Sequence, residues 1–239
     1  MKLAISQPTF LPWCGYIGLI DYVDNFVFLD DVQFDKRSWQ QRNKVKSNLG
    51  EQFISVPVKT KKKSRQLIKD VEINNQNFYQ EHLKIIKFNY SKSKYFDKIF
   101  PYFSDIEKKI SNEVHLSKIN IILINQIFKI LNLKKKIYQS SDLNIGDKKT
   151  SKLINICNHF KDKNYLINPG ALDYLKNDFD LLNNENIELY LLEYNEIKYN
   201  QLYGNFLSHL SIIDLLFNEG DNSINILNKS FNLNRIDLS

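Results

Sequence analysis

Several residue types that mark particular protein classes are scarce in this chain. Cys14 and Cys157 are the two cysteines among 239 residues, too few for a disulfide scaffold, and no Cys-x-x-Cys pair is present to bind a metal. No window approaches the roughly 18 uninterrupted apolar residues that a membrane-spanning helix needs. The amino terminus lacks the charged, apolar and small-residue segments of a secretory signal. We therefore expect a cytoplasmic protein without membrane insertion.

Histidines with the spacing of metal ligands are also missing. The four histidines are spread along the chain, and no two of them are spaced like the ligands of a metal site. They are His82, His115, His159 and His209. The sequence therefore predicts no metal site, and it identifies neither a cofactor nor an oligomeric state.

The bulk composition describes a globular protein with a mildly basic surface. Hydrophobic residues make up 43% and aromatic residues 13% of the chain, which excludes global disorder. The formal net charge of +6 raises the question of nucleic-acid binding. Lysine is spread throughout the chain, and its clusters at 59–65 and 134–136 are typical of a solvated loop and a helix exit. We expect no nucleic-acid partner, although positive charge helps to capture a phosphorylated substrate.

Alternating strand and helix patterns predict the fold class. Residues 2–6 and 25–29 are β-rich runs, and the apolar residues between them, from 16 to 24, recur at helical spacing. A second alternation follows later in the chain: helix 149–160, strand 164–167, turn 168–170, helix 171–175 and strand 187–192. This order predicts one α/β domain over residues 1–239, with a mostly parallel Rossmann-like sheet between flanking helices.

A hairpin is predicted after the first βαβ unit. Strands at 43–46 and 52–58 flank a turn at 47–50. A further short strand is expected at 71–73.

Helical patterns dominate the remaining segments. We place a helical insertion at approximately 78–133, in which Pro101 breaks an aromatic stretch. A helix at 211–218 is expected to close the fold, with Ser211 as its N-cap and Gly220 beyond its end.

The residues after the first strand are the first candidates for a site, because α/β folds bind ligands beyond the carboxyl ends of parallel strands. Gln7 and Pro8 end this strand, and Trp13 lies in the loop that follows. The Gln7 amide suits either a ligand's hydrogen-bonding edge or its own turn. Trp13 suits either a stacking platform or the core. We predict substrate binding for all three residues.

Two acids, Asp30 and Asp31, follow the second strand. Strand alternation turns one inward and one outward, so we expect one of them to serve a site. Such a carboxylate binds a hydroxyl or amine, coordinates Mg²⁺ or acts as a base, or else it caps its own loop. We choose Asp30 as a candidate catalytic residue.

The segment 36–43 combines two guanidinium groups, an indole and three amides. The guanidinium of Arg42 matches a carboxylate or phosphate in a bidentate manner, and Trp39 offers a stacking surface. Together with Gln33 and Asn43, these residues are predicted to bind substrate.

His209 precedes the final helix and lies close in sequence to Asp214, so it is a candidate catalytic base. The alternative is a structural hydrogen bond at a helix start. His82 receives the same interpretation with less support. Cys14 is a further candidate, as a thiolate nucleophile, but no signature of cysteine catalysis surrounds it.

Several strings resemble the WbqC-like protein family nearly from end to end. Residues 5–16 match its Q-P-x-(Y/F)-L-P-W-x-G-Y pattern, while Gln41 and the pair Asn168-Pro169 depart from the family pattern. The further matching strings are 30–34, 37–46, 56–58, 165–175 and 209–218. The resemblance implies a role in bacterial O-antigen (lipopolysaccharide), capsule or other surface-glycan assembly. Acyl or aminoacyl transfer to a nucleotide-linked amino sugar fits that setting.

The layout of the opening unit is also similar to the HIGH-type nucleotidyltransferase superfamily. In that superfamily two histidines hold the nucleotide phosphates, and here Trp13 and Tyr16 stand in their places. The string 61–64 resembles its second lysine motif, which a lysine-rich chain also produces by chance.

Our preferred hypothesis is a transferase that acts on a nucleotide-linked sugar, with His209 and Asp30 as catalytic residues. The alternatives are a non-catalytic binding or scaffold subunit of the glycan machinery and a nucleotidyltransferase-like enzyme that uses ATP.

Overall fold

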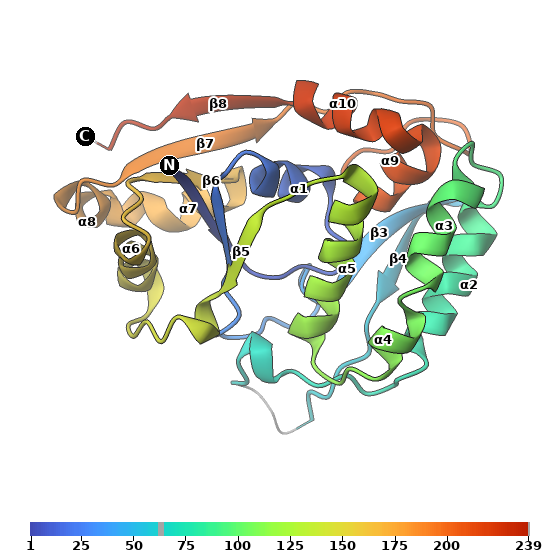
Figure 1. The fold of residues 1–239 in the computed structure, drawn as a ribbon, viewed down its shortest axis with the longest axis horizontal. Coiled ribbons are helices and arrows are strands. Elements are labelled where there is room, and N and C mark those ends of the chain that lie inside the picture. Colours follow the sequence, from blue (N-terminus) through green and yellow to red (C-terminus); the bar gives the residue numbers. More distant parts are fainter. Residues whose placement is uncertain (62–64, 239) are drawn as a thin grey trace.

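A mostly parallel sheet organises the molecule. The computed structural model describes residues 1–61 and 65–238, and these form a six-stranded sheet in the order β5-β2-β1-β6-β7-β8 (Figure 1). Its first five strands run parallel, and β8 pairs antiparallel with β7 at one edge. The strands are β1 (Lys2–Ser6), β2 (Asn25–Phe28), β5 (Lys136–Gln139), β6 (Asn164–Ile167), β7 (Glu188–Tyr194) and β8 (Phe231–Arg235). The predicted mixed α/β class and mostly parallel sheet are confirmed.

The strand order defines where the loops gather. Counted along the chain, the strands of this sheet lie in the order 3-2-1-4-5-6, which is also the order of doubly wound nucleotide-binding sheets. The order reverses between β1 and β6. In such sheets ligands bind outside the carboxyl ends of the strands at this reversal.

Successive side chains of each strand enter two separate cores, because they point to opposite faces of the sheet. Ala4 of β1 and Phe26 of β2 pack into one core. Leu3, Ile5 and Val27 pack into the other. Both faces are therefore apolar, as expected for parallel strands that helices cover on two sides.

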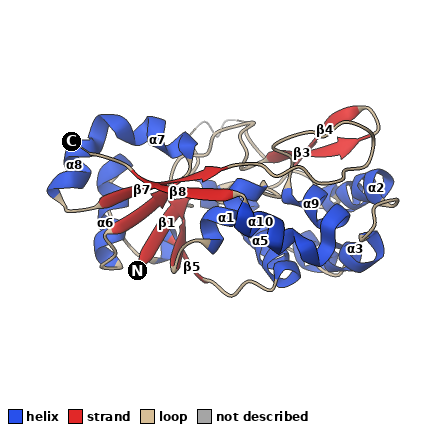
Figure 2. Cartoon of the chain, turned by 90° about the horizontal axis from the view of Figure 1, so that it is seen from above, coloured by secondary structure: helices blue, strands red, loops and turns tan. Residues whose placement is uncertain are grey.

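Helices cover both faces of the sheet (Figure 2). The helices on the face of Ala4 are α1 (Cys14–Asp21), α5 (Leu116–Leu131), α9 (Ile212–Glu219) and α10 (Ser223–Lys229). The helices on the opposite face are α6 (Lys149–His159), α7 (Pro169–Leu175) and α8 (Phe179–Asn184).

A hairpin and three further helices lie between β2 and α5 along the chain, at the right of Figure 1. The hairpin strands are β3 (Arg42–Ser47) and β4 (Gly50–Ser55), so the predicted hairpin is confirmed. The helices are α2 (Phe78–Tyr90), α3 (Phe96–Ser104) and α4 (Glu107–Ser111).

The structure corrects three expectations. The predicted strand at 71–73 is reduced to isolated bridges. Pro101 does not break the aromatic stretch but lies inside α3. Its missing N–H leaves the carbonyl of residue 97 without a helical partner, at an exposed position that water can reach. The helix at 211–218 does not close the fold, because α10 and β8 follow it.

The lysine-rich segment 59–65 is only partly described. Residues 62–64 lie outside the described part of the chain, and so does most of the string 61–64 that resembles a nucleotidyltransferase motif.

Candidate functional site

The carboxyl ends of β1, β2, β5 and β6 bring four polar segments to one edge of the sheet. Ser6 pairs with Phe28, and the backbone N–H of Leu29 donates to the Ser6 carbonyl at 2.9 Å. Phe28 in turn pairs with Gln139 of β5. The residues that follow these strand ends are Gln7, Asp30, Asp31, Ser140, Ser141 and Asn168. These residues define the carboxyl edge, which is the candidate site.

The loop after β1 is held by hydrogen bonds to its carbonyl oxygens. Asn43 Nδ2 donates to the carbonyls of Phe10 and Leu11 at 3.1 and 2.8 Å. Asn120 Nδ2 donates to the Pro8 carbonyl at 3.0 Å and to the Gln40 carbonyl at 2.8 Å. These bonds fix a loop that has no regular structure of its own.

The same bonds explain the placement of two predicted binding residues. Asn43 is only 2% exposed, and Pro8 is buried. In this structure the Asn43 amide positions the loop and does not face solvent. Substrate binding by Asn43 and Pro8 stays a prediction.

Gln7 projects from the end of β1 and is half-buried. Its Oε1 accepts a hydrogen bond from Gln40 Nε2 at 2.6 Å. Gln40 is itself 2% exposed, so the bond ties the loop before β3 to the carboxyl edge. The amide nitrogen of Gln7 has no protein acceptor among the described residues, and it is the half of the amide that suits a ligand.

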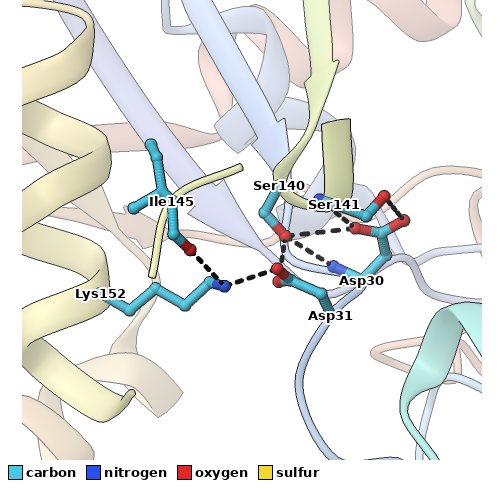
Figure 3. Close-up of polar contacts among 6 residues, drawn as sticks. All are labelled: Asp30, Asp31, Ser140, Ser141, Ile145 and Lys152. Atoms are coloured by element: carbon cyan, nitrogen blue, oxygen red, sulfur yellow. Dashed lines mark hydrogen bonds and ion pairs between the residues drawn. The ribbon is translucent and has the colours of Figure 1, made fainter. Parts of the chain in front are cut away.

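Asp30 joins the end of β2 to the turn after β5 (Figure 3). Its Oδ1 accepts from the Ser141 backbone N–H at 3.0 Å, and its Oδ2 accepts from Ser141 Oγ at 2.8 Å. The residue is 2% exposed. Both carboxylate oxygens therefore have protein donors, which hold two strand ends together, and a catalytic role for Asp30 stays a prediction.

Asp31 is the more accessible of the two acids. Its Oδ2 pairs with Lys152 Nζ of α6 at 2.5 Å, and the two side chains are 15% and 7% exposed. Ser140 Oγ lies 2.5 Å from Asp31 Oδ1 and 3.2 Å from Asp30 Oδ1. Because a hydroxyl has one proton, we assign the Ser140 donor to the nearer Asp31. The carboxyl edge thus presents a mostly buried, positioned carboxylate–ammonium pair (Figure 3).

A concave pocket adjoins this cluster. Its volume is about 480 Å³, and it opens between β5 and α5. Its lining comprises Phe28, Ile121, Asn125, Lys135, Ile137, Tyr138, Gln139, Asp142 and Leu143. Gln139 and Asp142 flank Ser140 and Ser141 in the chain, which places the pocket beside the Asp30 cluster. No residue of our predicted site lines this pocket.

Trp13 and His209 meet, although 195 residues separate them in the sequence. Their rings stack with centroids 5.4 Å apart, and Tyr194 packs edge-on against Trp13 at 5.2 Å. A backbone bridge joins Trp13 to Ser211. The strings that we had matched near the two ends of the chain therefore converge.

The surroundings of His209 do not resemble those of an activated base. The residue is exposed, and its backbone N–H donates to Glu196 Oε1 at 3.0 Å. The imidazole makes no hydrogen bond with any residue that the structure describes. Among the described residues no carboxylate orients the ring, and its role as a base stays a prediction.

Trp39, in the loop before β3, and Arg42 of β3 lie near the same ring, Phe53 of β4. The Trp39 ring stacks near Phe53 with centroids 6.4 Å apart, and the Arg42 guanidinium lies 4.7 Å from the Phe53 centroid. Gln33 is exposed, and its backbone bridges to Leu67. Substrate binding by Gln33 stays a prediction.

A buried polar network joins the hairpin to segment 195–210 and to α9. We did not predict this network from the sequence. Lys46 is 1% exposed, and its Nζ donates to Gln201 Oε1 at 3.0 Å and to the Asn205 carbonyl at 2.6 Å. Asp214 of α9 is fully buried. It accepts from Tyr90 Oη at 3.0 Å and from Tyr199 Oη at 2.8 Å.

Burial shifts both charged groups of this network toward their neutral forms. Burial raises the pKa of the Asp214 carboxyl, while hydrogen bonds from Tyr199 and Tyr90 oppose the shift. Burial also lowers the pKa of the Lys46 amine. The available signal was Asp214 in the apolar run 212–217, since an acid inside such a run needs buried partners.

The cysteines are unsuited to nucleophilic catalysis. Both Cys14 and Cys157 are buried, and burial raises the pKa of each thiol to about 12. At neutral pH they are therefore protonated, whereas the thiolate is the nucleophile. Across residues 1–61 and 65–238, no three or more His, Cys, Asp or Glu side chains are grouped to hold a metal ion.

In the described part of the chain, no helix combines the length and apolar character that crossing a membrane requires.

Comparisons with known proteins agree with the resemblance seen in the sequence. An uncharacterized protein of Mycobacterium tuberculosis, Rv1507c, is 34% identical over 220 residues, which cover 92% of this chain and 94% of the relative. No solved structure matches the chain. A family profile described as the WbqC-like protein family matches residues 7–226. The match covers nearly the whole chain and both of the converging ends, so this protein belongs to the WbqC-like protein family.

Proposed function

We propose that this protein is a cytoplasmic transferase that modifies a nucleotide-linked sugar for a bacterial surface glycan. The observation that carries the proposal is the carboxyl edge. A sheet with the strand order of nucleotide-binding folds presents a positioned Asp31–Lys152 pair at its carboxyl edge, and Gln139 and Asp142, the chain neighbours of Ser140 and Ser141, line a pocket of about 480 Å³. The association of the family with surface-glycan assembly supports the choice of substrate, and that support is associational.

The proposed reaction is acyl or aminoacyl transfer to an amino group of the sugar. The amine nitrogen attacks the acyl carbon of the donor, an amide bond forms, and the bond between the acyl group and its carrier breaks. The amine must lose a proton in this step, so a base within hydrogen-bond reach is needed, and the departing carrier takes up that proton. Asp31, which is 15% exposed, supplies the carboxylate, Lys152 and Ser140 hold it in place, and the Gln7 amide reads the ligand's polar edge. Asp30 positions this cluster through Ser141.

Thermal-shift screening against nucleotide sugars, acyl donors and ATP with Mg²⁺ tests the proposal. We expect at least one nucleotide sugar to raise the melting temperature. We expect Asp31→Asn to abolish that shift, while Asp173→Asn, an exposed change on α7, leaves it intact. Silence of the wild-type protein toward every nucleotide sugar would refute the proposal.

A scaffold role without chemistry is a second candidate, and the exposed aromatic residues of the hairpin favour it. It predicts ligand silence together with specific capture of a neighbouring glycosyltransferase in a pull-down. The ATP-using alternative has less support. Tyr16, which stands where a phosphate-binding histidine would lie, is 3% exposed, and its hydroxyl donates to the Gln7 carbonyl at 2.9 Å.

A further inference from the structure

The outer face of the β3–β4 hairpin carries side chains that the fold itself does not use. Strand alternation sends Asn43, Val45 and Ile54 inward, where they are buried. It sends Arg42, Lys44, Glu51 and Phe53 to the other face, where Lys44 pairs with Phe53 across the two strands. Lys46 shares this face near the turn, but it is buried and bonds to Gln201 and Asn205. We call Trp39, Arg42, Lys44 and Phe53 the hairpin platform.

Two aromatic rings of the platform remain half in solvent. Trp39 is 51% exposed and Phe53 is 47% exposed, although rings of this size usually bury most of their surface. Their planes differ by 23° and their centroids lie 6.4 Å apart. The two rings thus lie in nearly parallel planes, Phe53 on a hairpin that is fixed by its ladder of hydrogen bonds and Trp39 in the loop before it.

Positive charge adjoins this surface, and one cation lacks a partner. Lys44 is already paired with Glu51 at 2.7 Å. The Arg42 guanidinium, 4.7 Å from the Phe53 centroid, makes no ion pair or hydrogen bond with any described residue, and its buried Nε has no acceptor. A guanidinium offers a rigid fork that matches a carboxylate or phosphate. Arg42 is therefore the group of the platform that suits an anionic ligand.

We propose that the hairpin platform binds an acidic saccharide, and that this saccharide is the second substrate or the growing glycan of the proposed transferase. The C–H bonds of one face of a pyranose ring carry partial positive charge, which suits the negative face of an exposed aromatic ring such as Trp39. A sugar carboxylate then reaches Arg42. This inference rests on the proposed function for its place in the reaction, but not for the binding itself.

The platform is less suited to a nucleic acid. A single strand needs a basic groove that follows several phosphates as well as stacking rings. Arg42 is the one cation of the hairpin platform without an ionic partner, because Glu51 already neutralises Lys44. One guanidinium beside two rings instead matches one charged group beside one or two sugar rings.

Fluorescence titration tests the inference, because the chain has only two tryptophans and one of them, Trp39, lies in the platform. The probes are a galacturonic acid trisaccharide, the matching neutral galactose trisaccharide, uridine monophosphate and a short single-stranded oligonucleotide. We expect the acidic trisaccharide to change the emission and bind at least about tenfold more tightly than the other three, the difference that a lost charged contact of about 1.4 kcal/mol produces.

Variants locate the site. Arg42→Gln and Phe53→Ser are expected to weaken binding of the acidic trisaccharide about tenfold or more, and Arg42→Lys to restore it only in part. Arg235→Gln is the matched control, because it removes an exposed arginine of β8 that pairs with Glu188 of β7. This variant should bind the acidic trisaccharide like the wild type. Circular dichroism shows whether each variant is folded.

Three outcomes would overturn the inference: no binding of the acidic trisaccharide, equal binding of the neutral one, or preference for the nucleotide or oligonucleotide. Its failure is distinguishable from failure of the proposed function. If the protein binds nucleotide sugars but no acidic saccharide, the platform inference fails and the proposed function stands. If it binds the acidic saccharide but no nucleotide sugar, the platform inference stands and the proposed transferase function fails.

Discussion

At the scale of single residues, buried polar side chains mostly serve the backbone. Asn43 and Asn120 satisfy loop carbonyls that would otherwise be buried without a donor, and each such unsatisfied group costs about 1–3 kcal/mol. His82 has a backbone hydrogen bond with Ser55, but one of its ring nitrogens is unsatisfied. It is 5% exposed, its Nδ1 has no partner within the described residues, and its ring packs between Phe10 and Phe78.

His82 makes the stability of the protein sensitive to acid. Burial lowers the pKa of its imidazole from 6.5 to about 4, so the folded protein holds the neutral ring while the unfolded chain takes up a proton. The resulting stability is present above pH 6.5 and is lost as the pH falls toward 4. We expect His82→Leu to reduce the loss of unfolding free energy between pH 7 and pH 4 by about 3 kcal/mol.

Urea unfolding at the two pH values measures this effect. The exposed His159→Gln serves as the control and should retain the wild-type acid loss. An unchanged acid loss in His82→Leu would show that the ring is not held neutral.

The chemical type of each site residue could be read from the sequence, but its accessibility could not. Asp30 and Asp31 are adjacent, and strand alternation indicated that one of them faces a site. Which one depends on Ser141, more than 100 residues away, whose backbone N–H and hydroxyl both donate to Asp30. A local pattern contains no information about such partners.

At the scale of elements, close packing between α1 and β8 closes the end of the sheet. A Cβ atom built on Gly18 of α1 would lie 1.9 Å from the ring of Phe231 in β8. Glycine at position 18 therefore permits the helix to approach the last strand, and no larger residue fits without movement of the ring.

Gly18→Ala should destabilise the protein by about 1–3 kcal/mol, the usual cost of overpacking. Phe231→Leu in the same chain should recover part of the loss, because the two positions are coupled through one contact. Gly170→Ala is the matched control. Nothing lies within 4 Å of a Cβ atom added at position 170, which lies in the first turn of α7. The stability of the Gly170→Ala variant should therefore equal or slightly exceed that of the wild type. Equal melting temperatures of Gly18→Ala and Gly170→Ala would contradict this packing.

Elements with strong periodicity were predicted well, and the weak ones were not. β1, β6 and the hairpin have clear apolar patterns, and the structure confirms them. β8 was missed because Asn232 and Asn234 alternate with only two apolar residues, a weak strand pattern. Pro101 misled the prediction because its lost hydrogen bond falls on the solvent side of α3.

At the scale of the whole molecule, the Lys46 network joins parts that are distant in the chain. Lys46 belongs to the hairpin, Tyr90 to α2 and Asp214 to α9. The segment 195–210 has no helix or strand, and Lys46 holds it through Gln201 and the Asn205 carbonyl. The sequence showed each part separately but not that they meet.

Lys46→Met should loosen segment 195–210 while leaving the sheet intact, because it removes two of the hydrogen bonds that hold the segment. We expect limited chymotrypsin digestion to cleave the variant at Tyr199, Tyr203 or Phe206 at least several times faster than the wild type. Lys98→Met, which breaks an exposed pair with Asp221, is the control and should digest like the wild type. Equal cleavage in Lys46→Met would show that the segment is held by other contacts.

The central claim is that nucleotide-linked sugars bind at the carboxyl edge of the sheet. Hydrogen–deuterium exchange with and without a saturating nucleotide sugar tests it most directly, since exchange reports protection along the whole chain. The account predicts slower exchange in segments 7–13, 30–34, 139–143 and 168–171, and no change in α3 or α4. Protection confined to other segments, or none at all with a ligand known to be bound, would contradict it.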